Sequence, residues 1–271
     1  MGTLTPALLR GAVEVEARRV APATAARDYA ALRACLNASV EADVIARSPL
    51  RGIKLAPVDP PDRVTLSAEQ LYALADSIDA RYRALVLIGG VLGLRWGEAV
   101  GLRLSSVDFL RKTLSVDQTI SLVGGRIEVE PTKSRASRRT MTVPAFLIDE
   151  LAAHIAAHRR GAGPADLIFV GGRGAPLRRA FGDRVLRPAV TAADLDPTIT
   201  FHGLRHVAAS LMVANNEHPR VMMARLGHAT ASISLELYSH VSDDADRAAS
   251  DRLDAAFRAA RVSDKGCAVD G

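Results

Sequence analysis

The sequence predicts a mostly α-helical protein with one small antiparallel β-sheet, an α+β fold. Helical patterns of apolar residues account for most of the 271 positions. Three short segments instead alternate apolar and polar residues as strands do, and these are 114–118, 126–130 and 139–143. A content of 48% hydrophobic and 24% charged residues is typical of a globular chain that buries a core.

The pattern at the start of the chain predicts one or two helices within residues 3–41. Pro22 lies close to the start of the second helix, where a proline is tolerated. Four apolar residues have the spacing of one buried stripe on this second helix: Ala30, Leu32, Leu36 and Val40. Prolines then become frequent up to Pro61 and the apolar period is lost, which favours a linker.

These patterns divide the chain into four parts. We predict a helical unit at 1–56, a linker at 57–64, a main domain at 65–242, and a C-terminal helix and tail at 243–271. In the main domain, Ser67-Ala68-Glu69-Gln70 is a capping-box pattern that predicts a helix at 68–80. The apolar segment 82–92 predicts a buried helix that ends at Gly93.

The rest of the main domain contains the strands and further helices. Arg95 lies at the turn into a short helix at 97–102, and Gly124-Gly125 is expected to turn the first pair of the three strands. A short extended piece is expected at 167–170, between glycine-rich turns. Other helices are expected at 145–158, 178–193, 203–214, 219–226 and 232–239, followed by a charged amphipathic helix at 243–261.

Charge and cysteine content narrow the class of protein. The net charge of +5 and the pI near 9.6 favour a polyanionic partner. Cys35 and Cys267 are far apart and form no metal-binding spacing, so we expect a reduced protein. The longest apolar run, 84–94, is shorter than the ~20 residues that cross a bilayer. A soluble, cytoplasmic protein without a membrane segment is expected.

A group of chemically active residues lies between Thr200 and Val241. The motifs T-F-H-G-L-R-H, R-L-G-H and L-Y-S-H contain, in this order, His202, Arg205, His228 and Tyr238. A phenol, a guanidinium and two imidazoles suggest a nucleophile that faces an anion. Phosphate is the anion that fits, because the planar fork of an Arg matches its oxygens.

Two upstream motifs complete this group. Arg95 and Glu98 lie in G-L-R-W-G-E, and Lys133 lies in P-T-K-S, within the expected hairpin. This Arg with a Glu three residues on, the hairpin Lys, H-x-L-R-H, L-G-H and a Tyr ten residues after that His resemble the tyrosine recombinases, the phage integrase family. The resemblance covers roughly residues 50–244.

The resemblance implies a tyrosine-recombinase catalytic domain at 65–242, preceded by a partial helical core-binding (SAM-like) domain at 1–56. Family members usually carry a longer helical domain before the linker, so the N-terminal DNA-binding region is expected to be shortened. The implied reaction is attack of a Tyr oxygen on a DNA phosphorus, which leaves a 3′-phosphotyrosyl bond and a free 5′-hydroxyl. The resemblance implies no metal, ATP or other cofactor.

The resemblance also implies a role for each site residue. Tyr238 is the nucleophile, and Arg95 and Arg205 clamp the non-bridging phosphate oxygens, where fixed positive donors act most strongly in the transition state. The remaining roles are a hydrogen bond to the phosphate from His228, a general base at His202, protonation of the leaving 5′-oxygen by Lys133, and orientation of Arg95 or His202 by Glu98.

Arginines and histidines near these residues have simpler interpretations. Arg135, Arg138 and Arg139 lie beside Lys133 and are expected to contact phosphates along the duplex. His202 and His206 have the spacing of a zinc-binding helix, but Gly203 stands where a metalloprotease needs Glu, so no metal site is expected. A solvated helix face is expected for His154 and His158. A core or capping position is expected for His206 and His240.

We interpret the chain as a site-specific DNA recombinase of the integrase type, acting in phage or mobile-element integration or excision. Two other hypotheses stay open: a non-catalytic DNA-binding integrase remnant, and a DNA-relaxing enzyme similar to type IB topoisomerases. The implied partners are double-stranded DNA and a homotetramer on DNA, with an excisionase or a host architectural protein. Docking of the helix at 243–261 on a neighbouring protomer is a further hypothesis.

Overall fold

A computed structural model describes residues 5–50, 55, 64–123, 126–132, 138–172, 174–178, 180–227, 250–251 and 254. The chain divides into two compact units, Met1–Asp62 and Arg63–Gly271. The boundary falls within the predicted linker, most of which lies outside the described residues. Within the described part of the chain, no helix is both long enough and apolar enough to cross a membrane.

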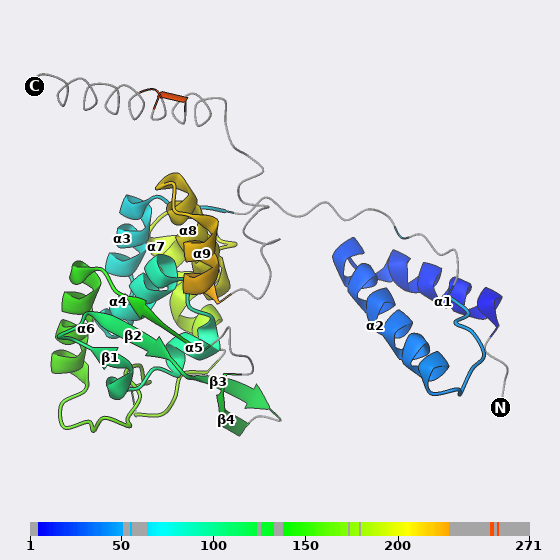
Figure 1. Cartoon of the computed structure of the whole chain (residues 1–271), viewed down its shortest axis with the longest axis horizontal. Helices are drawn as coiled ribbons and strands as arrows, with labels where there is room; N and C mark the ends of the chain where they lie inside the picture. The colour runs from blue at the N-terminus through cyan, green and yellow to red at the C-terminus, as the bar shows by residue number, and fades with distance from the viewer. Residues whose placement is uncertain are drawn as a thin grey trace, which may run out of the picture. The chain divides into compact units, whose positions relative to one another are not determined.

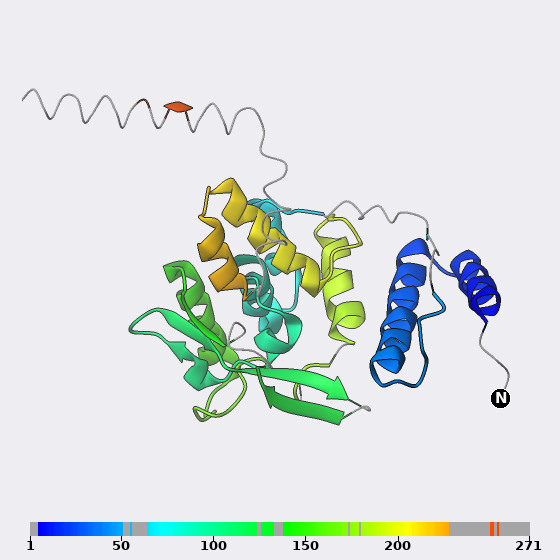
Figure 2. The ribbon, with the colours of Figure 1, turned by 45° about the vertical axis from the view of Figure 1, so that its right-hand side comes forward.

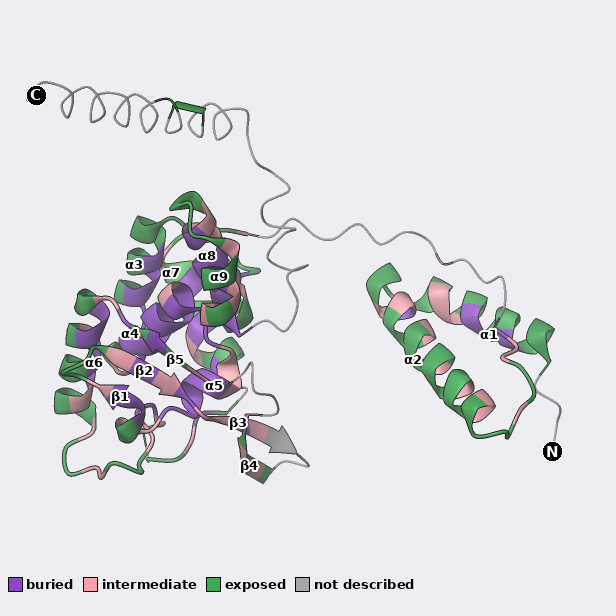
Figure 3. Ribbon diagram, in the orientation of Figure 1, coloured by how far each residue is buried: buried purple, intermediate pink, exposed green. Residues whose placement is uncertain are grey.

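The N-terminal unit contains two helices, α1 (Pro6–Arg19) and α2 (Pro22–Glu41) (Figure 1). Each begins with a proline in its first turn, where no N–H is needed. One or two helices were predicted within residues 3–41 and two are present, but the predicted buried stripe is wrong. Leu32, Leu36 and Val40 are only partly buried and Ala30 is exposed (Figure 3). Two helices alone cover only part of each other's apolar surface, so the spacing of a stripe does not ensure its burial.

The main unit begins with α3 (Ala68–Ser77) and α4 (Ala80–Leu87). The predicted capping box is confirmed, because Gln70 N donates to Ser67 Oγ (3.2 Å) and Ser67 N donates to Gln70 Oε1 (2.9 Å). Asp79 caps α4 separately, so α3 ends three residues before the predicted position. The chain continues through a π-helical turn η1 (Ile88–Leu92), α5 (Trp96–Val100) and a 3₁₀ turn η2 (Leu104–Ser106).

The strands form two antiparallel sheets rather than the one predicted. A three-stranded sheet has the order β1 (Val107–Asp108), β2 (Thr113–Val116) and β5 (Arg139–Thr142). The hairpin of β3 (Gln118–Val123) and β4 (Arg126–Pro131) extends from the main unit (Figure 2). The predicted pairing of 114–118 with 126–130 is therefore wrong, because β2 pairs with β5 and a strand that was not predicted pairs with β4. Gly124-Gly125 lies outside the described residues.

The second half of the main unit is helical, with α6 (Ala145–His158), η3 (Gly182–Leu186), α7 (Arg187–Ala192), α8 (Phe201–Ala214) and α9 (Pro219–Leu226). The bounds predicted for α6 and α9 are confirmed. The extended piece at 167–170 makes isolated bridges at Leu167 and Val170. The predicted helices at 232–239 and 243–261 lie outside the described residues, apart from Ser250, Asp251 and Asp254, which are helical.

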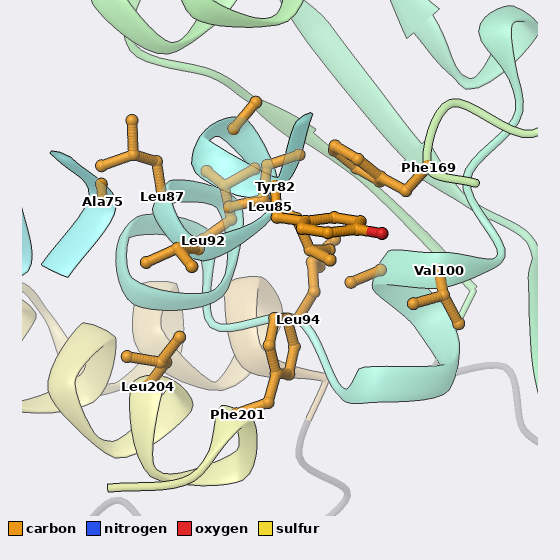
Figure 4. Close-up of a cluster of buried hydrophobic side chains, with 14 of the residues drawn as sticks. Ala75, Tyr82, Leu85, Leu87, Leu92, Leu94, Val100, Phe169, Phe201 and Leu204 are labelled. Atoms are coloured by element: carbon orange, nitrogen blue, oxygen red, sulfur yellow. The ribbon is translucent and has the colours of Figure 1, made fainter. Parts of the chain in front are cut away.

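The larger of two buried apolar clusters fills most of the main unit, and α4 with η1 runs through it. Figure 4 shows apolar side chains of this segment, among them Leu85, Leu87 and Leu92. They pack in one cluster with side chains of other parts of the chain, such as Leu94 and Leu204. Leu85, Leu87 and Leu92 have no exposed surface, as expected for the uniformly apolar segment 84–92. Because Leu94 is equally buried, the following residue, Arg95, starts from a fixed backbone position.

His154 on α6 departs from the sequence prediction. It was expected on a solvated face, but it is only 6% exposed and its ring lies 4.9 Å from that of Phe169. Its Nε2 is 3.1 Å from the carbonyl of Ile168, which can only accept, so Nε2 carries the proton. Burial lowers the pKa of His154, and the His is therefore a neutral core residue.

Gly93 joins three elements of the main unit. Its φ of +67° is left-handed, and it ends η1 with a hydrogen bond from its N–H to Gly89 (3.2 Å). A Cβ placed here would lie 2.5 Å from Leu226 Cδ2 on α9 and 3.2 Å from Ala208 Cβ on α8. The absence of a side chain therefore permits both the turn and the close approach of α8 and α9.

We expect Gly93→Ala to lower the free energy of unfolding by about 2–4 kcal/mol. About 1–2 kcal/mol comes from the left-handed backbone and the rest from overpacking against Leu226. Urea denaturation measures the loss. The matched control is Gly161→Ala, because Gly161 also has a positive φ (+75°) but has no atom within 4 Å of its Cβ position. Equal losses in the two variants would contradict the tight contact at Gly93.

Candidate active site

The carboxylate of Glu98 lies at the centre of the candidate site. Glu98 is on α5, three residues after Arg95, and is only 3% exposed. Its Oε2 accepts the backbone N–H of Arg95 (3.0 Å), and its Oε1 accepts from Arg95 Nη1 (2.9 Å). The short helix thus fixes the Glu and the guanidinium together, and the Arg95 side chain keeps 42% of its surface exposed.

Arg139 on β5 holds the same carboxylate from another element. Its Nη1 donates to Glu98 Oε1 (3.2 Å) and its Nη2 donates to Glu98 Oε2 (3.0 Å). Such a two-point contact matches the guanidinium fork to the carboxylate. The Arg139 side chain is only 7% exposed, so this geometry differs from the expected contact with phosphates along a duplex. Arg138, its neighbour, is exposed and can still make such contacts.

Arg205 reaches the site from the middle of α8. It is 4% exposed, and its Nη1 donates to the carbonyl of Gly93 (2.6 Å) while its Nη2 donates to that of Leu226 (2.5 Å). Thr200 begins the helix by accepting the N–H of Gly203 at its side-chain oxygen (3.0 Å). A single guanidinium therefore links the end of η1 to the end of α9.

The C-terminal end of α9 is held by the same arginines. Its last carbonyls have no partners within the helix, and they carry the negative end of its dipole. Three consecutive carbonyls accept one arginine each: Arg225 from Arg139 Nε (2.7 Å), Leu226 from Arg205 Nη2 (2.5 Å) and Gly227 from Arg95 Nη2 (3.3 Å). Gly227 ends the helix with a left-handed φ of +65°, and His228 is the next residue.

The arginines around the Glu98 carboxylate give the site a net positive charge, which favours the binding of an anion. Burial raises the pKa of Glu98, but the hydrogen bonds and charge of Arg139, with those of Arg95, outweigh it and bring the pKa below its ordinary value of 4.5. The stability from this pairing is present above the ordinary pKa and is lost as pH falls through the lowered one. Burial, followed by the charge of Arg95, lowers the pKa of Arg205 to about 10, so it stays charged at neutral pH.

His202 lies on the first turn of α8, on the exposed side of the site. Partial burial of the ring, followed by the charges of Arg205 and Arg95, lowers its pKa. A His with a lowered pKa is neutral at pH 7 and can accept a proton. Its ring is perpendicular to that of His206, with centroids 5.2 Å apart. Among the described residues, no group of three or more His, Cys, Asp or Glu is placed to hold a metal ion.

The structure thus brings together four of the predicted site residues, Arg95, Glu98, His202 and Arg205. Lys133, Arg135, His228 and Tyr238 lie outside the described residues. The inward position of Arg139 was missed, although a signal existed. In the alternating segment 139–143, Arg139 shares its side of the strand with Met141 and Val143, which are 5% and 2% exposed.

Known proteins resemble this chain in sequence. A family model described as the phage integrase family matches residues 65–245. The integrase of Mycobacterium phage FRAT1 is 29% identical over 86% of this chain and 70% of its own length, and that of Mycobacterium phage L5 is 29% identical over 92% and 67%. The chain therefore spans about two thirds of the length of these relatives.

Solved structures resemble the fold of this chain. The Tn1549 transposon integrase, in complex with a circular intermediate DNA, superposes with a TM-score of 0.78. The alignment covers 93% of this chain and 86% of that one at 20% identity. At this identity the likeness concerns the fold alone.

Proposed function

The chain belongs to the phage integrase family and is a tyrosine recombinase, and from this premise we propose that Arg95 and Arg205 hold the scissile phosphate of a DNA strand for attack by Tyr238. The biological role that we propose is site-specific recombination during integration or excision of a phage or mobile element. The observation that carries this proposal is the position of the two guanidinium groups. They come from distant parts of the chain and meet at the end of α9. Arg95 donates to the buried carboxylate of Glu98 and to the carbonyl of Gly227, the residue before His228. Arg205 donates to the carbonyl of Leu226, two residues before His228.

The proposed reaction exchanges one phosphodiester for another. The Tyr238 oxygen attacks phosphorus in line, the 3′-phosphotyrosyl bond forms, and the bond to the 5′-oxygen breaks. The phenolic proton passes to His202, and the leaving 5′-oxygen takes a proton from Lys133. Another 5′-hydroxyl then reverses the step and joins a new strand. Because the bond energy is retained, the balance requires no external energy source.

Electrostatics of the described site support these roles. A Tyr with a pKa near 10 is ~3 units from neutral pH, so its deprotonation costs about 4 kcal/mol. The transition state places further negative charge on the non-bridging oxygens. Arg95, Arg205 and Arg139 surround a single carboxylate and leave excess positive charge there. Fixed donors in a site with little water offset such a cost effectively.

The test is covalent trapping of the protein on DNA. Nicked duplexes with randomised centres are incubated with the full chain, and complexes that resist denaturant are selected and mapped by peptide sequencing. We expect attachment to the peptide that contains Tyr238 and recovery of a common DNA sequence. Salt-sensitive binding without any adduct would contradict catalysis and indicate a non-catalytic DNA-binding protein. Relaxation of supercoiled plasmid without sequence preference would indicate a topoisomerase-like activity instead.

The proposed partners follow from the same reaction. Double-stranded DNA is the substrate, and exchange between two duplexes requires four strand cleavages, which fits a homotetramer on DNA. We also propose an excisionase or a host architectural protein as a partner that sets the direction of the reaction, and the cytoplasm as its location. Sedimentation of the chain with paired DNA sites tests the tetramer, and an unchanged 1:1 complex would contradict it.

A further inference from the structure

Arg139 on β5 connects this strand to α5 and α9. Its guanidinium holds both oxygens of Glu98, and its Nε donates to the carbonyl of Arg225 (2.7 Å). The side chain of Arg225 returns to the same strand, because its Nη1 donates to the carbonyl of Thr142 (3.3 Å). Two side-chain bonds in opposite directions thus tie β5 to the end of α9.

From this geometry we propose that Arg139 is a positioning residue of the strand-cleavage reaction. It neutralises Glu98 and fixes the end of α9, so that Arg95 and Arg205 keep their orientation toward the phosphate. This inference rests on the proposed function of the site, and the proposed role of Arg139 acts through Glu98 and the end of α9.

The difference in exposure and contacts between Arg139 and Arg95 supports this role. Arg139 is 7% exposed and bound to both oxygens of Glu98, whereas Arg95 is 42% exposed and uses Nη1 for the same carboxylate. If Glu98 had Arg95 as its only close cationic partner, the carboxylate would draw in the whole fork of that guanidinium. With Arg139 in place, Arg95 keeps an open face for phosphate oxygens.

Arg139 lies close in sequence to one site segment and contacts a residue close to another. It lies six residues after Lys133, so it anchors the chain just beyond the segment that carries the proposed proton donor. At the other end of its contacts, the carbonyl of Arg225 is three residues before His228. A shift of Arg139 would therefore move the described residues that follow the segment of Lys133 and those that precede His228.

The experiment compares Arg139→Met and Arg139→Lys with a matched control, Arg111→Met. Arg111 lies in the turn between β1 and β2, and its side chain is 84% exposed. Single-turnover adduct formation is measured on the DNA selected with the wild type, together with the dissociation constant for the same DNA. We expect Arg139→Met to slow cleavage about 100-fold while DNA affinity changes less than about threefold. Arg139→Lys should recover only part of the rate, because an ammonium lacks the fork.

The pH profile distinguishes positioning from a general loss of structure. Among the residues that the structure describes, the charged groups that face Glu98 are Arg95, Arg139 and Arg205. Without Arg139, burial of Glu98 is less well offset, so its pKa rises. Cleavage by Arg139→Met should then fall as pH drops through this raised pKa, within a range where the wild type is unaffected. The double variant Glu98→Gln/Arg139→Met has no buried carboxylate, and the fall should disappear.

Hydrogen exchange tests the same inference without catalysis. The amide of Gly227 donates to Met223 (2.8 Å), and its exchange reports the closure of the last turn of α9. We expect exchange in 219–227 to become at least about tenfold faster in Arg139→Met and in the double variant than in Arg111→Met. Unchanged exchange together with an unchanged pH profile would overturn the inference. If the wild type forms no adduct, the proposed function fails, whereas the exchange result still decides whether Arg139 fixes the end of α9.

Discussion

Tyr238→Phe is expected to abolish covalent attachment of the chain to DNA. The substitution removes one oxygen, and no other group of that residue can form a bond with phosphorus. Adduct formation on the selected nicked duplex should fall below detection in a denaturing gel. DNA affinity should stay within about twofold, and the free energy of unfolding within about 0.5 kcal/mol, because a single hydroxyl is removed.

The positions of the other tyrosines support this assignment. The chain contains four, and the structure describes Tyr29, Tyr72 and Tyr82. Tyr29 belongs to the N-terminal unit and donates to the carbonyl of Leu50 (3.4 Å). Tyr82 is 9% exposed and packs edge-on against Phe181 in the core. Tyr72 is 38% exposed on α3, beside Phe146. None of these three contacts the arginines around Glu98 through a described hydrogen bond.

The matched control is Tyr72→Phe, which removes the same atom from an accessible tyrosine. It should form adduct at the wild-type rate. An adduct that persists in Tyr238→Phe would show that another residue is the nucleophile. In that case, peptide mapping of the trapped complex would identify it, and the proposed roles of His202 and Lys133 would have to be assigned again.

Local features of the fold could be predicted from the sequence. The bounds of α6 and α9 depend on short-range patterns, such as Pro219 in the first turn and Gly227 after the last. Ser67 and Gln70 determine the start of α3 in the same way. Where neighbours in sequence decide the structure, the residues themselves carry sufficient information.

Strand pairing could not be predicted in this way. The segment 114–118 has a strand pattern, but the pattern does not specify its partner, and β2 pairs with β5 across more than twenty residues. Asp117 separates β2 from β3, so the chain leaves one sheet and enters the other at a single residue. Burial on α2 was mispredicted for a related reason, because it depends on which other helices cover the stripe.

The candidate site was predictable in its side chains but not in its backbone. Arg95, Glu98 and Arg205 occur in recognisable motifs, and the structure brings them together. The carbonyls at the end of α9 accept arginines from three elements, yet a carbonyl has no sequence signature. For this reason Arg139 was assigned to DNA, although its place in the alternating strand indicated an inward side chain.

Arg205→Lys is expected to reduce strand cleavage by about 10³-fold, which corresponds to about 4 kcal/mol of transition-state stabilisation. The planar fork is lost, even at a pH low enough for the ammonium to keep its charge. Arg205 donates to Gly93 with one nitrogen and to Leu226 with another, and it is proposed to use its remaining donors for the phosphate. A single ammonium cannot reach these three directions at once. Single-turnover adduct formation measures the loss.

The exposed control for this variant is Arg187→Lys. Arg187 lies on α7, its side chain is 67% exposed, and it pairs with Asp183 at 3.0 Å. Because that contact is at the surface, the same substitution should change cleavage less than about twofold. If both variants lost the same fraction of the cleavage rate, the loss would come from replacing Arg with Lys in general and not from the contacts of Arg205 with the phosphate.

The burial of residue 205 also predicts that cleavage by Arg205→Lys depends on pH. The surroundings of Arg205 lower its pKa from 12.5 to about 10, chiefly by burial and then by the charge of Arg95. A Lys in this position starts from about 10.4, so the same surroundings bring its pKa toward the physiological range. The ammonium is charged below that pKa and neutral above it. The residual cleavage by Arg205→Lys should therefore fall as pH rises from 6 to about 9, whereas the wild-type guanidinium stays charged. If the cleavage rate of Arg205→Lys had the same pH dependence as that of the wild type, this result would contradict the burial of residue 205 in the reacting complex.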